Sequence, residues 1–118
     1  MEWTTERRYR RYEDWTTEEK QAIQDHMAKS PWHTHYHVEP KAGLLNDPNG
    51  FSYFDGKWIL FYQNFPFGAA HGLKSWVQTE SEDLVHFKET GVTLLPDTDL
   101  DSHGAYSGSA MQFGDKLF

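Results

Sequence analysis

The chain has 118 residues, which suits one small domain at most, and its formal net charge of -7 excludes nucleic acid and anionic membrane surfaces as main partners. The chain has no cysteine, which excludes a disulfide framework, a thiol nucleophile and a Cys-based zinc site. Its N-terminus is too polar for a signal-peptide core, and no apolar run approaches membrane-spanning length. We therefore expect a cytoplasmic protein.

The first 30 residues predict an N-terminal extension with one helix. Residues 1–14 mix charged and aromatic side chains without a clear period, and the four arginines in residues 7–11 form either a small anion-binding patch or a solvated arm. Thr16 with Glu19 three residues later is a capping-box pattern, and apolar residues recur at helical spacing up to Met27. Pro31 disfavours further helix. We expect a helix over residues 16–29 that serves packing rather than catalysis.

From residue 31 onward the sequence indicates short antiparallel strands. Two β-rich runs, residues 50–54 and 57–63, flank Asp55-Gly56, which is a strong signal for a two-residue hairpin. We predict a strand at residues 73–79 and another at residues 107–113. Residues 84–88, between them, are predicted as a strand or turn. Residues 116–118 look like the start of a return strand that is cut short, so we expect the chain to be a piece of a longer protein.

Three histidines alternate at positions 33, 35 and 37, with Glu39 on the same alternation. On a strand these side chains would share one face, and neutral imidazole is a metal ligand. The other interpretation is a histidine-rich strand whose rings are hydrogen-bonded to neighbours. No second ligand cluster with standard spacing follows, so we expect neither a metal nor another cofactor.

Two further patterns fail as known motifs. The acidic residues 97–101 resemble a calcium loop, but Ser102 and Gly108 occupy the positions where that loop needs Gly and Glu. The hydroxyl-rich residues 104–110 lack the Gly-x-Ser-x-Gly order of a nucleophile elbow. Ser107 remains a possible hydrogen-bond donor to a polyol.

The run at residues 43–50 places one carboxylate, Asp47, inside a turn of Asn, Pro and Gly. Pro48 restricts Asp47 to an extended or turn conformation. A carboxylate that a rigid turn aims among apolar and aromatic residues suits attack on a sugar, whereas the same residue types also form ordinary surface turns. Gln63 ends a strand nearby, and its amide offers an acceptor and two donors for sugar hydroxyls.

Four segments, taken in order, resemble glycoside hydrolase family 32, the invertases and other β-fructosidases. Residues 45–50 are similar to the family's Asn-Asp-Pro-Asn-Gly motif, and residues 60–63 are similar to its Phe-Tyr-Gln motif. Residues 76–87 resemble its Trp-Gly-His…Ser-x-Asp-Leu-x-His-Trp segment, and residues 106–110 resemble Phe-Ser-Gly-Ser-Ala. The N-terminal extension and residues 32–37 look most like the bacterial intracellular sucrose-6-phosphate hydrolase branch.

The resemblance implies an all-β fold. The chain would form the first blade and the start of the second blade of a five-bladed β-propeller, preceded by a short N-terminal helix. Residues 1–30 would be the extension, and residues 31–118 the start of an incomplete catalytic domain.

The resemblance also implies retaining hydrolysis of the β-fructofuranosidic bond of sucrose 6-phosphate or sucrose in sucrose catabolism. Asp47 would be the nucleophile, and a small sugar the only partner. Substrate-binding positions carry over to Leu44, Leu45, Asn46, Gln63, Tyr106 and Ser107. The family's acid/base Glu lies in a Glu-Cys motif that this chain lacks, so we expect the 118-residue chain alone to be inactive.

Two departures from the family concern the side of the pocket that holds the leaving group. Val77 and Gln78 replace the usual Gly-His after Trp76, and His71 stands where many members have Trp. A histidine there favours a charged substrate group, with a phosphate on the glucose as one hypothesis. A different class also stays open, namely a small β-domain that binds sugar or metal without catalysis, or a purely structural piece.

Overall fold

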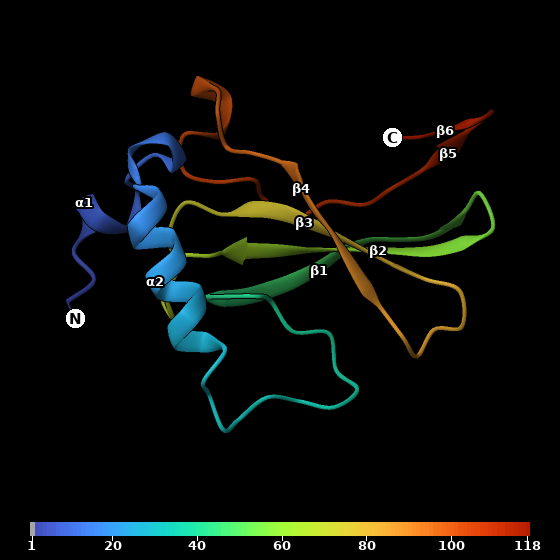
Figure 1. The fold of residues 1–118 in the computed structure, drawn as a ribbon. Coiled ribbons are helices and arrows are strands. Elements are labelled where there is room, and N and C mark those ends of the chain that lie inside the picture. Colours follow the sequence, from blue (N-terminus) through green and yellow to red (C-terminus); the bar gives the residue numbers. More distant parts are fainter. Residues whose placement is uncertain (1) are drawn as a thin grey trace.

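The computed structural model describes residues 2–118 and centres on one antiparallel sheet with strand order β1-β2-β3-β4 (Figure 1). Its strands are β1 (Leu44–Phe54), β2 (Lys57–Phe65), β3 (Ser75–Ser81) and β4 (Lys88–Leu94). A second, two-stranded sheet pairs β5 (Gln112–Phe113) with β6 (Lys116–Leu117). The helices are α1 (Thr5–Arg8) and α2 (Thr17–Met27), with 3-10 turns at Tyr12–Asp14 and Asp99–Asp101. The helices gather at one end of the large sheet, and the β5–β6 hairpin lies toward the other.

The predicted helix is confirmed as α2, and its start has the predicted capping box. The Glu19 backbone N–H donates to the Thr16 hydroxyl, and the Glu19 carboxylate accepts from the Thr16 backbone N–H. These two bonds satisfy donors that a helix start otherwise leaves unpaired. The short helix α1 was not predicted, because four residues are too few to show a helical period.

The predicted hairpin is also confirmed. Phe54 pairs with Lys57 across a two-residue turn, in which Asp55 and Gly56 both have positive φ, at 50° and 78°. This is the conformation that an Asp-Gly pair adopts with little cost, because Gly has no Cβ and Asp tolerates the left-handed region. The return strand at residues 116–118 exists as β6, paired with β5.

Two strand predictions were wrong, and a third segment took the second of its two predicted forms. Residues 84–87, predicted as part of a strand or turn, form a bend and an irregular stretch, and strand β4 begins at Lys88. Residues 107–113 are mostly irregular, because their polar groups bond to distant parts of the chain, and only Gln112–Phe113 is a strand. Residues 33–37 are not a strand, so the three histidines do not share a strand face.

The core joins the N-terminal segment to the sheet. Trp15 is 2% exposed and stacks on Phe67 with ring centroids 4.2 Å apart, and Phe65 completes this buried cluster. The Tyr12 hydroxyl donates to the Leu73 carbonyl at 3.1 Å, and burial raises the pKa of Tyr12 to about 12. Residues 3–15 are thus bound to the sheet end near which the candidate site lies.

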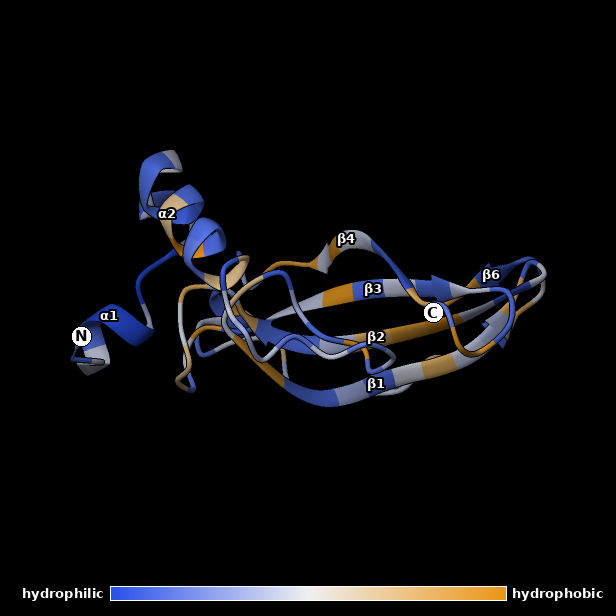
Figure 2. Ribbon diagram, turned by 60° about the horizontal axis from the view of Figure 1, so that its bottom comes forward, coloured by the Kyte–Doolittle hydropathy of each residue, from blue (hydrophilic) through white to orange (hydrophobic). Residues whose placement is uncertain are grey.

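Figure 2 shows that α2 is mostly hydrophilic, while apolar residues lie along β2 and β3. The second buried cluster contains Ile59, Phe61 and Trp76 from those two strands. Within residues 2–118, none of the helices has both the length and the apolar character to cross a membrane.

Candidate functional site

A pocket of about 270 Å³ collects most of the predicted site residues. β1 supplies Asn46 and Asp47, β2 supplies Gln63, and the segment after β4 supplies Tyr106 and Ser107. This volume is near the lower end of the roughly 300–1,000 Å³ that small-molecule sites span. The structure therefore brings five of the predicted side chains to one concavity.

An irregularity in β1 presents Asp47 to this pocket. The β1–β2 register shifts between Leu45 and Pro48, so Asn46 and Asp47 leave the regular ladder. A bulge of this kind redirects side chains, and β1 is an edge strand, where proline is tolerated. The Asn-Asp-Pro order thus produces the local geometry that exposes the carboxylate.

Both carboxylate oxygens of Asp47 accept hydrogen bonds. Asn46 Nδ2 donates to Oδ1 at 2.9 Å, and Ser107 Oγ donates to Oδ2 at 2.5 Å. Hydrogen bonds to an ionised carboxylate are shorter and stronger than neutral ones. Asp47 is exposed to the pocket yet held in one orientation.

Gln63 links the two segments that form the site, β1 and the segment after β4. Its side chain is buried, its Oε1 accepts from Asn46 Nδ2 at 3.1 Å, and its Nε2 donates to the Ala105 carbonyl at 2.7 Å. Because an amide has two donors and two acceptor lone pairs, one of each remains for a ligand. Gln63 fixes Asn46, and Asn46 in turn orients Asp47.

Asn49 supports the same site from within β1, and sequence reasoning gave it no role. It is buried, its Nδ2 donates to the Asp47 carbonyl at 2.8 Å, and its Oδ1 accepts from the Gly108 backbone N–H at 2.9 Å. Trp76 Nε1 donates to the Tyr106 carbonyl at 3.0 Å. These bonds place Ser107 beside Asp47. The position of Asn49 within the Asn-Asp-Pro-Asn-Gly motif was the available signal.

Two of the predicted binding residues do not line the pocket. Leu44 packs against the cluster of Trp15, Phe65 and Phe67, and Leu45 pairs with Asn64 in the β1–β2 ladder. The rest of the pocket wall comes from residues that the motifs did not indicate, apart from the noted His71. These are Tyr9, Gly72, Lys74, His103, Gly104 and Ala105. These residues come together in the pocket through contacts between distant segments, and local sequence patterns do not reveal such contacts.

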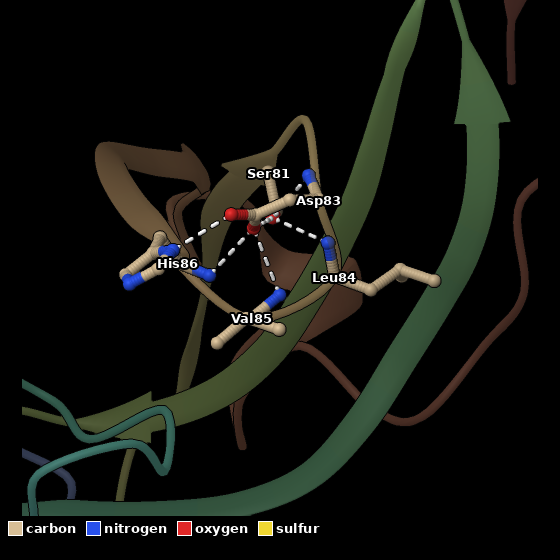
Figure 3. Close-up of polar contacts among 5 residues, drawn as sticks. All are labelled: Ser81, Asp83, Leu84, Val85 and His86. Carbon is tan, nitrogen blue, oxygen red and sulfur yellow. Dashed lines mark hydrogen bonds and ion pairs between the residues drawn. The ribbon is translucent and has the colours of Figure 1, made fainter.

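The Ser81, Asp83 and His86 motif forms a separate turn after β3 (Figure 3). Asp83 Oδ1 accepts from the backbone N–H groups of Val85 and His86, and Ser81 Oγ accepts from that of Leu84. The ring of His86 and those N–H groups hold the pKa of the Asp83 carboxyl well below its usual range. The motif closes a turn in which Leu84 has φ 66°. The hydrogen bonds of this turn explain the spacing of Ser81, Asp83 and His86, and they give the motif a structural role.

An ion pair between His33 and Glu39 closes the histidine segment. His33 Nδ1 contacts the Glu39 carboxylate, which also accepts from the Thr34 backbone N–H and hydroxyl. The bond to Glu39 raises the pKa of His33 above its ordinary value. Among residues 2–118, no group of three or more His, Asp or Glu side chains is placed to hold a metal ion.

Comparison with known proteins gives one family match. The family described as "Glycosyl hydrolases family 32 N-terminal domain" matches residues 37–118. Sucrose-6-phosphate hydrolase of Streptococcus mutans is 75% identical over 111 residues, which cover 94% of this chain and 23% of that protein. Sucrose-6-phosphate hydrolase of Lactococcus lactis is 55% identical over 118 residues, covering 100% of this chain and 25% of that protein. The chain thus spans about a quarter of the length of the curated relatives it matches.

Solved structures agree with this match. Sucrose-6-phosphate hydrolase from Lactobacillus gasseri has a TM-score of 0.95 at 53% identity, covering 98% of this chain and 24% of that one. A Bombyx mori GH32 beta-fructofuranosidase has a TM-score of 0.72 at 36% identity, covering 90% of this chain and 22% of that one. The likeness confirms the predicted fold class, an all-β chain from the N-terminal part of a five-bladed β-propeller, preceded by a short N-terminal helix.

Proposed function

From the premise that this chain belongs to glycosyl hydrolase family 32, we propose that the complete protein is a retaining β-fructofuranosidase. Its substrate is sucrose 6-phosphate or sucrose, and its place is sucrose catabolism in the cytoplasm. One observation carries the proposal: the open pocket holds Asp47 with both carboxylate oxygens oriented by Asn46 and Ser107. The names of the relatives support the substrate class.

In the first step, an Asp47 carboxylate oxygen attacks C2 of the fructofuranosyl unit. The new C2–oxygen bond forms as the glycosidic bond breaks, and an acid elsewhere in the protein donates a proton to the departing oxygen. Water activated by the same acid, now a base, then hydrolyses the fructosyl–Asp47 ester. The sugar leaves with retained configuration, and Asp47 returns to its carboxylate form.

The structure describes one half of the carboxylate pair that this chemistry needs. Within residues 2–118, Asp47 is the one carboxylate lining the pocket, whereas retaining enzymes place a second carboxyl about 5–5.5 Å away. We assign that second group to the part of the protein that extends beyond this chain. The 118-residue chain alone is therefore expected to release no fructose.

The remaining site residues bind the sugar in this proposal. Asn46, Gln63 and Ser107 each reach the pocket with donors or acceptors for fructose hydroxyls, and Tyr106 adds an exposed ring. Leu44 and Leu45 stay weaker candidates, since neither lines the pocket. The partners are small sugars, not nucleic acid or membrane. The division into an extension, residues 1–30, and the start of a catalytic domain, residues 31–118, belongs to the same proposal.

The test is hydrolysis by the complete gene product, followed by NMR during the first turnovers. We expect fructose release from sucrose 6-phosphate or sucrose, with the β-anomer appearing first. Initial release of the α-anomer would show inversion and would refute Asp47 as a nucleophile. Sugar binding without turnover would favour the non-catalytic module instead.

A further inference from the structure

The pocket that contains Asp47 has a second wall of opposite chemical character. That wall presents three basic side chains: His71, Lys74 and His103. The whole chain is acidic, with 18 Asp and Glu residues against 11 Lys and Arg, so a cluster of basic side chains in one pocket differs from the overall charge of the chain. Asp47, the acidic member of the lining, is already engaged by Asn46 and Ser107. The basic side chains lack a carboxylate partner in the pocket lining.

Close backbone contacts hold this wall together. The Ala105 backbone N–H donates to the Lys74 carbonyl at 2.8 Å. Gly104 has φ 115°, and a Cβ at that position would lie 2.8 Å from the Lys74 backbone nitrogen. Only glycine permits both that φ and that approach. The contact brings the segment that carries His103 against Lys74, although β3 and β4 separate the two in the chain, and both side chains line the pocket.

The N-terminal arm, residues 5–12, supplies the rest of the wall. The Leu73 backbone N–H donates to the Arg8 carbonyl at 2.8 Å, which fixes the arm beside Lys74. Tyr9 lines the pocket and meets the His103 ring edge-on, with centroids 5.5 Å apart. The Arg8 guanidinium lies 5.9 Å from the Tyr9 ring centroid and adds a further positive charge nearby. The arm therefore packs directly against the basic wall.

We propose that Lys74, His71 and His103 bind the phosphate group of a 6-phosphorylated substrate while Asp47 acts on its fructosyl unit. Tyr9 is a positioning residue that holds the His103 ring against the wall. The proposal deepens the proposed function and rests on it. A phosphate carries about -1.5 to -2 charges and three strong acceptor oxygens, which an ammonium and two ring N–H groups match. An acidic protein elsewhere repels this anion, so the wall also gives discrimination.

The test compares sucrose 6-phosphate with sucrose in the complete gene product. Lys74→Gln should lower kcat/KM for sucrose 6-phosphate by roughly ten- to a hundredfold, the range for a hydrogen bond to a charged group, and should lower kcat/KM for sucrose by a much smaller factor. Lys74→Arg should keep most of the preference. Lys57→Gln is the matched control, because it removes the same charge from a residue outside this pocket. Raising the ionic strength should weaken the binding of sucrose 6-phosphate and should leave the binding of sucrose unchanged.

The role of Tyr9 is tested in the same assay. Tyr9→Ala should raise KM for sucrose 6-phosphate by a larger factor than KM for sucrose, whereas Tyr9→Phe keeps the edge-on ring and should behave as the natural protein. Equal losses on both substrates in Lys74→Gln, or no preference for the phosphate in the natural protein, would overturn the proposal and leave the hydrolase assignment intact.

Calorimetry separates that failure from failure of the proposed function. If neither sugar is cleaved, glucose 6-phosphate should still bind more tightly than glucose or inorganic phosphate, and Lys74→Gln should abolish the difference. Equal binding of glucose 6-phosphate and glucose refutes the basic wall. Inorganic phosphate binding as tightly as glucose 6-phosphate would show a site for free phosphate and would also refute it.

Discussion

Replacing Trp15 by alanine should detach the N-terminal arm from the sheet. The side chain is 2% exposed and stacks on Phe67, and the guanidinium groups of Arg10 and Arg7 lie 4.6 and 5.5 Å from its ring. Truncation of a buried Trp costs about 3–5 kcal/mol. No hydrogen bond is lost with it, since Trp15 Nε1 has no partner among the described residues. We therefore expect a loss within that range.

Native-state trypsin cleavage at the arm's arginines measures this loss, because cleavage follows the population of the open form when opening and closing are fast. A loss of 3–5 kcal/mol increases the population of the open form by a factor of about 100 to about 4,000. Trp32→Ala is the matched control, since Trp32 is 86% exposed and should change cleavage little. Equal cleavage rates in Trp15→Ala and Trp32→Ala would refute the packing argument.

Two further predictions concern loops near the sheet. Gly43→Ala should destabilise the protein by more than about 1 kcal/mol, because Gly43 has φ 77° and an added Cβ would lie 2.0 Å from a backbone carbonyl oxygen. Gly56→Ala, at φ 78° with no atom within 4 Å, should cost less in the same urea titration, and the reverse order would contradict the reasoning. Hydrogen bonds from the Thr34 backbone N–H and from His33 lower the pKa of Glu39 from 4.5 to about 2. The stability that this lowered pKa contributes should be present above pH 4.5 and lost as pH falls through about 2; an NMR carboxyl titration with its midpoint near 4.5 would disagree.

The elements predicted correctly are those whose signals are local. The Thr16 capping box and the Asp55-Gly56 turn satisfy their own backbone groups within a few residues, so their sequence patterns decide their structure. The strand predicted over residues 107–113 failed for the opposite reason. There the Gly108 N–H bonds to Asn49, and the Tyr106 carbonyl accepts from the Trp76 ring, and neither partner is visible in a local window.

The candidate site divides in the same way. Asp47 and Gln63 were identified through short motifs, and the structure places both in one pocket. Tyr9, Lys74 and His103 were missed, because their convergence depends on the N-terminal arm lying beside β3 and on Gly104 packing against Lys74. The basic wall of the pocket forms through contacts between distant segments, so no single stretch of the sequence predicts it.

The identity of Asp47 as the attacking group is the central claim, and Asp47→Asn in the complete gene product tests it most directly. Asparagine keeps the size of the side chain and removes the nucleophilic carboxylate. We predict a fall in kcat of at least about 10⁴-fold with folding unchanged, as for other catalytic nucleophiles, whereas Asp55→Asn in the hairpin turn should keep full activity. An Asp47→Asn enzyme that retains more than about a tenth of the natural kcat would contradict the account.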